Sequence, residues 1–308
     1  SALVDAVNLY VAQTNPSSRH LTFSEALSAV RKTDRFNDLS KGTRADYNSR
    51  WTRLESFLKG KKLAEITPSL LETFLKKKCA KSTRFKFYVA LNVLWESYFI
   101  GTRRVTKFNP LKELPDPPQK QPSKSKVPYT CSEVFTLLDA VKRPKLSVAL
   151  NIAFYTGLRA SELCRVQLKD FMRGSEIEWG NDPYIHMPAE KTKEKSAKDV
   201  YLPSYLIKYL RSNSYFNSLS PEDKIFPHTA KTLRLQMKAR CLAAGVAWKG
   251  AAVTRATFTT HAAKGWLVSN HDLTDQLGHS TDQMVIQHYQ KYASIEDCKR
   301  YFQRGLER

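Results

Sequence analysis

The stretch SVALNIAFYTGLRASEL, residues 147–163, says most about the fold. Its first part is apolar on all sides, which is typical of a buried helix, and Gly157 is a helix-ending residue. Arg159 follows just past that glycine, so its guanidinium can point out of the fold. Glu162 lies three residues further on and can hold the arginine. The stretch therefore predicts a buried helix that delivers an arginine to a surface; an ordinary surface ion pair is the alternative.

Around this stretch the sequence predicts a mainly helical half. Upstream, Thr130 and Glu133 form a capping-box pattern at the start of CSEVFTLLDAV. Downstream, IEWG, YIHMPA and DVYLP alternate as short strands, with EKTKEKSAK as the turn between the last two. We expect a helical domain with one small antiparallel β-sheet. Further helices are predicted over 204–211, 229–244, 255–269, 271–277 and 281–289, and the tail 294–308 is amphipathic.

The N-terminal half predicts helices alone. Apolar residues recur at three- and four-residue steps after three capping positions, Ser40, Thr67 and Ser82. Residues 1–35 add two shorter helical patterns. The fold class that follows is mainly α with a small antiparallel β-sheet.

The clearest break in the chain is ELPDPPQKQPSKSKVPYT, residues 113–130, which holds five prolines. Proline stiffens such a stretch and stops helices, so we predict an extended linker. The predicted organisation is an N-terminal helical extension over 1–35, a helical domain over 36–112, the linker over 113–128 and a mixed α+β domain over 129–308.

Positive charge is the strongest compositional signal. The chain has 308 residues, with 50 Lys and Arg against 29 Asp and Glu, a formal charge of +21. Residues 41–126 alone carry 20 Lys and Arg against 7 acidic residues. Solvated helix faces explain any single lysine, but the whole excess indicates a polyanion, with nucleic acid first and an anionic membrane surface second. No run of about 18 apolar residues predicts a membrane span. We expect double-stranded DNA as the partner.

Cysteine and histidine patterns give no metal or disulfide signal. The five cysteines are scattered without a CxxC, and the seven histidines show no HExxH. The opening SALVDAVNLY lacks the basic start of a signal peptide. We therefore expect a cytoplasmic protein, nucleoid-associated if prokaryotic, that uses no metal and no other cofactor.

Four further residues stand in positions suited to phosphate chemistry. Lys191, or alternatively Lys193, lies in the turn after YIHMPA; Arg255 begins the helix of TRATFTTHAA; His279 follows a helix-ending glycine in LGHS; and Tyr289 closes the next helix. Each one alone also fits an ordinary role, as a solvated turn lysine, a helix-start residue or a half-buried tyrosine.

In this order, TGLRASEL, the strand-turn lysine, R-x-x-F-x-T, LGH and a trailing tyrosine resemble the catalytic domain of the tyrosine recombinase (phage integrase) family. The N-terminal half, which closes on NPL, resembles that family's core-binding domain. VPYTCSEVFTLLDA is similar to the usual opening of the catalytic domain. The likeness covers roughly residues 36–300, and it implies a two-domain C-shaped clamp around duplex DNA.

The resemblance also implies a role for each candidate. Tyr289 would attack a DNA phosphate, giving a 3′-phosphotyrosyl link and a free 5′-hydroxyl. Arg159 and Arg255 would clamp the non-bridging oxygens, for which a planar, permanently charged guanidinium is suited. Lys191 would protonate the leaving 5′ oxygen, and His279 would hydrogen-bond the phosphate. Because the phosphotyrosine keeps the bond energy, the reaction implied needs neither ATP nor metal.

One departure from the family pattern precedes the second arginine. The family places His or Lys three residues before it, and here that position is Ala252. Lys249 or His261 could supply the missing group, or it is absent.

A second departure concerns the spacing of the nucleophile. The interval from histidine to tyrosine is one residue longer than usual, and His288 occupies the usual position. One residue turns a helical side chain by about 100°, so the start of the helix must adjust. Tyr292 is the alternative nucleophile.

The resemblance implies a homo-tetramer on DNA, with an accessory directionality or bending factor as a further candidate partner. The tail 294–308 would dock on a neighbouring protomer or pack on its own domain. Three rival functions stay open: a DNA-binding architectural protein or repressor without catalysis, which Ala252 favours, a type IB topoisomerase, and a hairpin telomere resolvase. Phage integration, transposition of a mobile element and chromosome-dimer resolution are equally compatible tasks.

Overall fold

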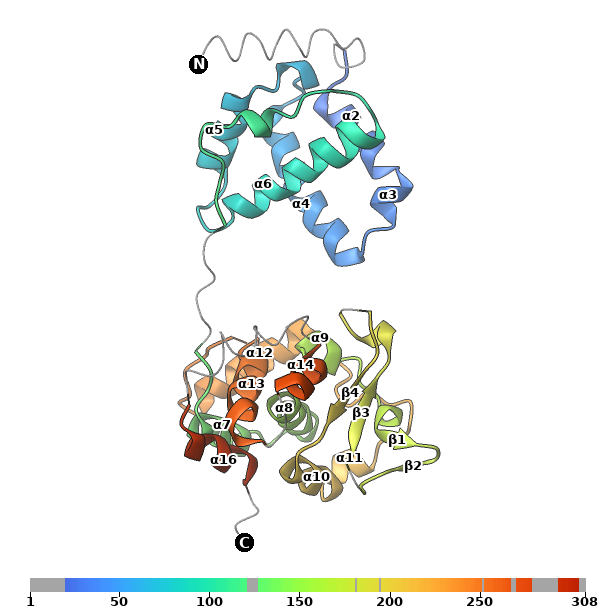
Figure 1. The fold of residues 1–308 in the computed structure, drawn as a ribbon, viewed down its shortest axis with the longest axis vertical. Helices are drawn as coiled ribbons and strands as arrows, with labels where there is room; N and C mark the ends of the chain where they lie inside the picture. The colour runs from blue at the N-terminus through green and yellow to red at the C-terminus, as the bar shows by residue number, and fades with distance from the viewer. Residues whose placement is uncertain are drawn as a thin grey trace. The chain divides into compact units, whose positions relative to one another are not determined.

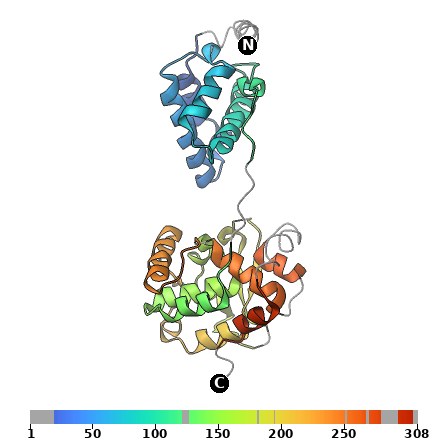
Figure 2. The same ribbon diagram turned by 90° about the vertical axis from the view of Figure 1, so that its left-hand side faces the viewer.

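The computed structural model describes residues 20–120, 127–180, 182–193, 195–250, 252–266, 270–278 and 293–304. The chain divides into two compact units, Ser1–Ser123 and Lys124–Arg308, and the division falls inside the proline-rich stretch. In Figures 1 and 2 the first unit runs from blue to green and the second from green to red. Both units are mainly helical, as the sequence predicts.

The N-terminal unit is a set of helices around an aromatic core. Trp51 lies at its centre: the indole nitrogen donates to the Ala90 carbonyl at 2.9 Å, and the Phe36 and Tyr98 rings lie 5.4 and 5.8 Å from its ring. The described helical segments are α2 (Phe23–Arg31), α3 (Asp34–Asn37), α4 (Lys41–Leu58), η2 (Leu63–Glu65), α5 (Pro68–Lys78), α6 (Arg84–Val93), η3 (Leu94–Thr102) and η4 (Pro110–Glu113).

Two of the three predicted helix starts in this unit are confirmed. The hydroxyls of Ser40 and Thr67 accept backbone N–H groups from the first turns of α4 and α5. The third helix begins at Arg84 instead of directly after Ser82. The backbone N–H and the hydroxyl of Thr83 both donate to the Ala80 carbonyl, at 2.9 and 3.0 Å, and this turn delays the helix.

The C-terminal unit is organised around α8 (Pro144–Thr156), which is buried along nearly its whole length, as predicted. Its end at Gly157 has a positive φ of 69°, a backbone conformation that favours glycine. Figure 1 shows α8 in the middle of the unit, among its other helices. These are α7 (Cys131–Asp139), α9 (Ala160–Leu163), η5 (Leu168–Phe171), η6 (Ala189–Lys191), α10 (Ser204–Arg211), α11 (Ser214–Asn217), α12 (Ala230–Ala243), α13 (Val253–Gly265), α14 (Asn270–Leu277) and α16 (Ile295–Phe302).

The helix predicted over ASELCRVQL is shorter than expected. It ends after Leu163 because the chain turns to pair with a distant segment: the Ile225 N–H donates to the Val166 carbonyl at 3.0 Å, and Gln167 bridges to Lys224. A backbone group used in that pairing cannot also continue a helix.

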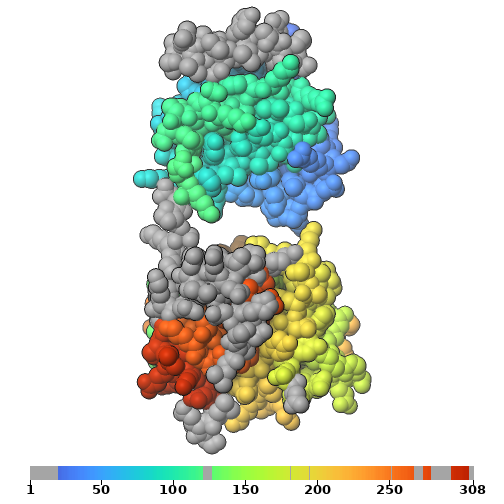
Figure 3. All heavy atoms as spheres, viewed as in Figure 1, coloured from blue at the N-terminus to red at the C-terminus, as the bar shows by residue number. Residues whose placement is uncertain are grey.

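The predicted single sheet is in fact two separate two-stranded sheets. β1 (Met172–Arg173) pairs with β2 (Glu176–Ile177), and β3 (Tyr184–Met187) pairs with β4 (Lys198–Tyr201), both antiparallel. The IEWG segment therefore pairs backwards across the tight turn at Gly174 and not with YIHM. In Figures 1 and 3 the yellow turn between β3 and β4 projects from the surface of its unit.

The tail helix α16 packs on its own unit. Cys298 and Tyr301 are fully buried, the Tyr301 hydroxyl donates to the Phe154 carbonyl at 2.6 Å, and its ring stacks on His261 at 4.2 Å. These apolar residues are therefore already covered within the chain. Of the two alternatives for the tail, packing on its own unit is confirmed for these buried residues of α16, and docking of the tail on a neighbouring protomer stays a prediction.

Candidate active site

Arg159 stands at the start of α9, where it and Glu162 form a reciprocal cap. The Arg159 guanidinium donates to Glu162 Oε1 at 2.8 Å, and the Arg159 backbone N–H donates to Glu162 Oε2 at 3.1 Å. The Glu162 side chain is fully buried, whereas the Arg159 side chain keeps 23% of its surface exposed. The predicted pairing is confirmed, and it fixes the direction of the arginine.

Arg255 meets the same region from a distant part of the sequence. It lies in the first turn of α13 and donates through Nη1 to the Gly157 carbonyl at 3.1 Å and through Nη2 to the Leu277 carbonyl. This approach depends on Gly157, because a Cβ there would lie 2.5 Å from the Phe258 ring. Gly157 therefore ends α8 two residues before Arg159, and its carbonyl accepts a hydrogen bond from Arg255.

Lys198 joins this cluster, and the sequence did not predict it. It begins β4, its side chain is only 8% exposed, and its Nζ lies 3.2 Å from Glu162 Oε2. Side chains alternate between the two faces of a strand, and this alternation could have predicted its position. Lys198 shares a strand face with Val200 and Leu202, both of which are buried. The sequence alone assigns Lys198 to the end of the turn EKTKEKSAK.

Charges within the cluster perturb one another. Burial opposes ionisation of Glu162, but Lys198 and the bonds from Arg159 outweigh it, so the pKa of the carboxyl is held below its ordinary value. Burial lowers the pKa of Lys198, Glu162 opposes this effect, and repulsion by Arg255 and Arg159 adds to it. The site thus holds Arg159 and Lys198 on one carboxylate, with Arg255 close enough to repel the charge of Lys198.

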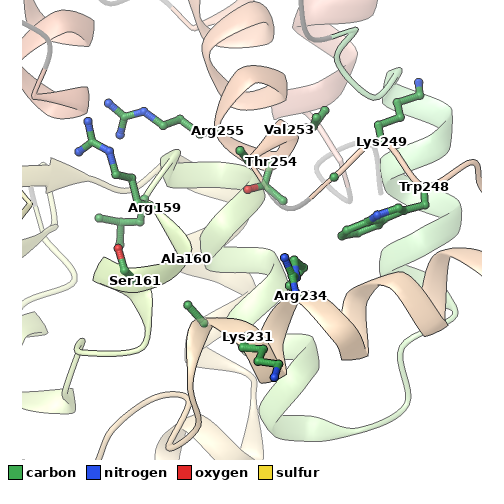
Figure 4. Close-up of a pocket in the computed structure, with 14 residues that line it drawn as sticks. Arg159, Ala160, Ser161, Lys231, Arg234, Trp248, Lys249, Val253, Thr254 and Arg255 are labelled. Carbon is green, nitrogen blue, oxygen red and sulfur yellow. The ribbon is translucent and has the colours of Figure 1, made fainter. Parts of the chain in front are cut away.

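A cavity of about 990 Å³ opens beside the two arginines. Figure 4 shows the Arg159 and Arg255 side chains close together, with Lys231 and Arg234 of α12 and the Trp248 ring elsewhere around the cavity. Within the described parts of the chain, Lys231 and Arg234 have no acidic partner. The cavity is therefore lined by positive charge and suits a phosphate-bearing ligand.

Lys191 lies in a different environment from the arginines. Its Nζ donates to Asp170 Oδ1 and Oδ2 at 2.7 and 2.8 Å and to Gln167 Oε1 at 2.8 Å, and its side chain is 12% exposed. The alternative, Lys193, is exposed in the same turn. Neither lysine shares a contact with Arg159, Glu162 or Arg255 among the interactions described.

The two candidates for the group missing at Ala252 are both engaged elsewhere. Lys249 lines the cavity, but its ammonium donates to Glu133 Oε2 at 2.6 Å and to the Pro128 carbonyl at 3.0 Å. His261 is 1% exposed, and its Nε2 lies 3.2 Å from the Tyr129 carbonyl. Burial lowers the pKa of His261. His261 is thus a core residue, so the suggestion that it supplies the missing group was wrong.

The remaining candidates lie outside the described residues. They are His279, Tyr289, His288 and the alternative nucleophile Tyr292. The structure describes the chain up to Gly278 on one side of this stretch and from Ala293 on the other.

Neither a metal site nor a membrane span is found in the described ranges. No cluster of three or more His, Cys, Asp or Glu side chains there could hold a metal ion. No helix that the structure describes combines the length and apolar character needed to cross a bilayer.

Residues 130–294 match the profile of the Phage integrase family. No curated protein matches the sequence. The fold is similar to a lambda integrase dimer bound to a COC′ core site, with a TM-score of 0.70, 15% identity, and coverage of 89% of this chain and 99% of that one.

Two further solved structures share the fold. The Tn1549 transposon integrase in complex with transposon right end DNA gives a TM-score of 0.64 at 14% identity, with coverage of 93% of this chain and 100% of that one. The XerH recombinase bound to palindromic difH substrate gives 0.61 at 16% identity, with 92% and 90% covered. At these identities the likeness establishes the fold.

Proposed function

Because this chain belongs to the phage integrase family, we propose that it is a site-specific recombinase that cleaves and rejoins DNA strands through a 3′-phosphotyrosyl intermediate. The matched segment spans more than half of the chain and contains every candidate residue named above. The proposed substrate is duplex DNA, which the charge of +21 favours.

The observation that carries the proposal is the meeting of Arg159 and Arg255 beside one basic cavity. The two residues come from separate helices, and Glu162 and the Gly157 carbonyl hold them in place. Two fixed guanidinium groups suit the non-bridging oxygens of one phosphodiester, whose charge grows in the transition state. Donors held in advance need no reorganisation when the phosphate reacts.

The nucleophile and its helpers complete the proposal. Tyr289 attacks the phosphorus, His279 hydrogen-bonds the phosphate, and a lysine of the β3–β4 turn, Lys191 by sequence, protonates the leaving 5′ oxygen. An unassisted tyrosine has a pKa of about 10 and is a poor nucleophile at neutral pH, so the surrounding cations are needed. We propose no cofactor and no metal.

The domain roles and partners are part of the same proposal. Residues 36–112 bind DNA, residues 129–308 carry out the chemistry, and the two close as a clamp on duplex DNA across the linker at 113–128. The active form is a homo-tetramer on DNA, and the protein acts in the cytoplasm, on the nucleoid if the host is prokaryotic. Solved structures of similar fold include a lambda integrase tetramer bound to a Holliday junction.

A catalytically impaired DNA-binding protein is the second candidate function. Ala252 favours it, because the family's usual His or Lys is missing there and both candidate replacements, Lys249 and His261, bind other groups. Such a protein would bind duplex DNA in the cavity without forming a covalent bond.

A nicked duplex substrate separates the two functions. The nick lies near the cleavage position, so the short strand diffuses away after cleavage and the enzyme stays covalently attached. Duplexes are first selected from a randomised pool by binding to the protein. The recombinase predicts covalent adducts with the wild type and none with Tyr289→Phe. Loss of one preorganised donor costs roughly 10²–10³ in rate, so Arg255→Ala should bind DNA and cleave that much more slowly.

The DNA-binding architectural protein predicts the opposite result. Duplex binding by the wild type without any covalent adduct would establish the architectural protein and exclude the recombinase. Relaxation of supercoiled DNA without a preferred site would instead indicate a type IB topoisomerase, and hairpin-ended products a telomere resolvase.

A further inference from the structure

We propose that Trp248 stacks on a nucleobase drawn out of the duplex beside the scissile phosphate, so that the cavity holds a nucleotide and not only a phosphate. The inference rests on the proposed function for its ligand, duplex DNA, and for the position of the scissile phosphate at Arg159 and Arg255. It adds a contact to a base, which the two arginines do not provide, and it makes Trp248 a specificity-determining residue.

Trp248 differs from the other tryptophans of the chain in what its ring contacts. Among the residues that the structure describes, the rings of Trp51, Trp95, Trp179 and Trp266 each pack against at least one aromatic ring. No aromatic ring there packs on Trp248, which is half-buried against the core and lines the cavity. Part of this ring is therefore open to a ligand.

The backbone on both sides of Trp248 is anchored, so the ring is positioned before any ligand binds. The Val246 N–H donates to the Cys241 carbonyl at 2.9 Å, and the Lys249 N–H donates to the Tyr129 hydroxyl at 3.0 Å. Figure 4 shows the Trp248 ring extending from this loop into the cavity, while the two arginines line another part of its wall. A side chain fixed in this way loses little conformational freedom on binding.

The cavity has room for a nucleotide beside the ring. Its volume of about 990 Å³ lies at the upper end of the roughly 300–1,000 Å³ typical of small-molecule sites. Four of its lining residues are Ala or Gly, namely Ala160, Ala230, Gly250 and Ala252. The His or Lys that the family places at position 252 would reduce this space. Ala252 thus fits a nucleotide site as well as it fits a loss of catalysis.

The wall of the cavity combines the two features that a nucleotide requires. Arg159 and Arg255 suit the scissile phosphate, and Lys231 and Arg234, without an acidic partner in the described parts of the chain, suit a neighbouring phosphate. The flat Trp248 ring suits a base. A paired base presents only its edges in the grooves, so its face reaches a ring only after it has left the stack. The ring therefore points to an extruded base, and stacking on it offsets the cost of extrusion.

Three duplexes that differ at one base test the proposal by equilibrium binding. They carry the site selected from the randomised pool with a paired base, a mispaired base or an abasic position, and each nucleotide of the site is changed in turn. Mispairing removes much of the cost of extrusion. At one nucleotide beside the mapped cleavage position, Trp248→Ala should bind the mispaired duplex about 5–150-fold more weakly than the wild type. The loss should be smaller on the paired duplex, and the two proteins should bind the abasic duplex equally.

Further substitutions separate stacking from packing and from misfolding. Trp248→Phe keeps a flat ring and should retain most of the preference for the mispaired over the abasic duplex. Trp248→Leu keeps an apolar side chain against the core but has no ring face, so it should bind as Trp248→Ala does, and thermal melting checks that each variant is folded. Trp179→Leu is the matched control, because Trp179 is also half-buried but does not line the cavity. It should bind all three duplexes as the wild type does.

Three results would overturn the inference. An equal loss in Trp248→Leu on all three duplexes would show that the ring packs on the sugar and phosphates of a paired duplex. Wild-type binding of every duplex by both Trp248→Ala and Trp248→Leu would show that the ring does not contact DNA. A responsive base far from the mapped cleavage position would place the ring away from the scissile phosphate.

The proposed function fails by a different result. If the three duplexes bind in the predicted order but the wild type forms no covalent adduct with the nicked duplex, base stacking on Trp248 is supported and the recombinase is excluded. Covalent adducts with no effect of Trp248→Leu on binding would support the recombinase and exclude the stacking.

Discussion

Glu162→Gln is the substitution that tests the charged cluster most severely. The carboxylate is fully buried, and the side chains of its two partners, Lys198 and Arg159, are 8% and 23% exposed. Glutamine has nearly the same shape and can still accept one hydrogen bond, but it leaves the cations without a counter-charge. Breaking a buried pair by removing one partner costs roughly 3–5 kcal/mol.

We expect the lower end of that range, about 3 kcal/mol, because Arg159 keeps contact with water. For a unit of this size 1 kcal/mol moves the melting temperature by roughly 2–4 °C, so the C-terminal unit should melt about 6–12 °C lower. Scanning calorimetry of the full chain measures this, with the N-terminal unit as an internal reference.

The pH dependence of the effect has a defined sign. The pKa of Glu162 is below its ordinary value in the folded chain, so its contribution is present above about pH 4.5 and disappears as the pH falls through the lowered pKa. Wild type and Glu162→Gln should therefore converge in stability in acid. The control is Glu222→Gln, which breaks an exposed pair with Lys169 and should leave the melting temperature unchanged. Equal melting temperatures for the two variants at pH 7 would refute the buried cluster.

Three other predictions follow from the same structure. Replacing both Lys231 and Arg234 by Ala should reduce the slope of log affinity against log salt by about 1.8, since each phosphate contact contributes about 0.9; filter binding at several salt concentrations measures it. The pKa of His261 is lowered by burial, so folding stability should fall as the pH drops below about 6.5, and His261→Gln should flatten part of that profile in urea unfolding. Tyr301→Phe removes the hydrogen bond to the Phe154 carbonyl and should cost about 1–3 kcal/mol, because a buried carbonyl loses its donor.

Each of these predictions has its own contrary result. If the double variant of Lys231 and Arg234 keeps the wild-type salt slope, as the control Lys169→Ala should, then α12 does not contact DNA. A pH profile that His261→Gln leaves unaltered would mean that the imidazole is not held neutral in the folded protein. A Tyr301→Phe variant as stable as the wild type would show that α16 is not anchored by its hydroxyl.

Local signals predicted the parts of the fold that depend on few residues. Gly157, Thr130 and Ser40 fix helix ends through backbone conformation or one side-chain hydrogen bond, and the structure confirms all three. The pairing of Arg159 with Glu162 could also be predicted from the sequence, because residues three apart on a helical turn are neighbours.

Long-range contacts were the parts that the sequence could not supply. No residue pattern near Val166 predicts that its carbonyl pairs with the distant Ile225 or that α9 ends early as a result. The burial of His261 against Tyr301 likewise depends on where α16 packs. Lys198 was missed because a run of lysines was assigned to one turn, although the alternation from Lys198 to Val200 and Leu202 already indicated an inward face.

The central claim is that the basic cluster serves a tyrosine that becomes covalently joined to DNA. The direct test is mass spectrometry of the trapped complex after nuclease and trypsin digestion, because Lys291 separates the two candidate tyrosines. We predict a nucleotide remnant on Tyr289, in the peptide spanning 265–291. A remnant on Tyr292, in the peptide spanning 292–299, would move the nucleophile, and the absence of any remnant from a protein that binds the duplex would contradict the account.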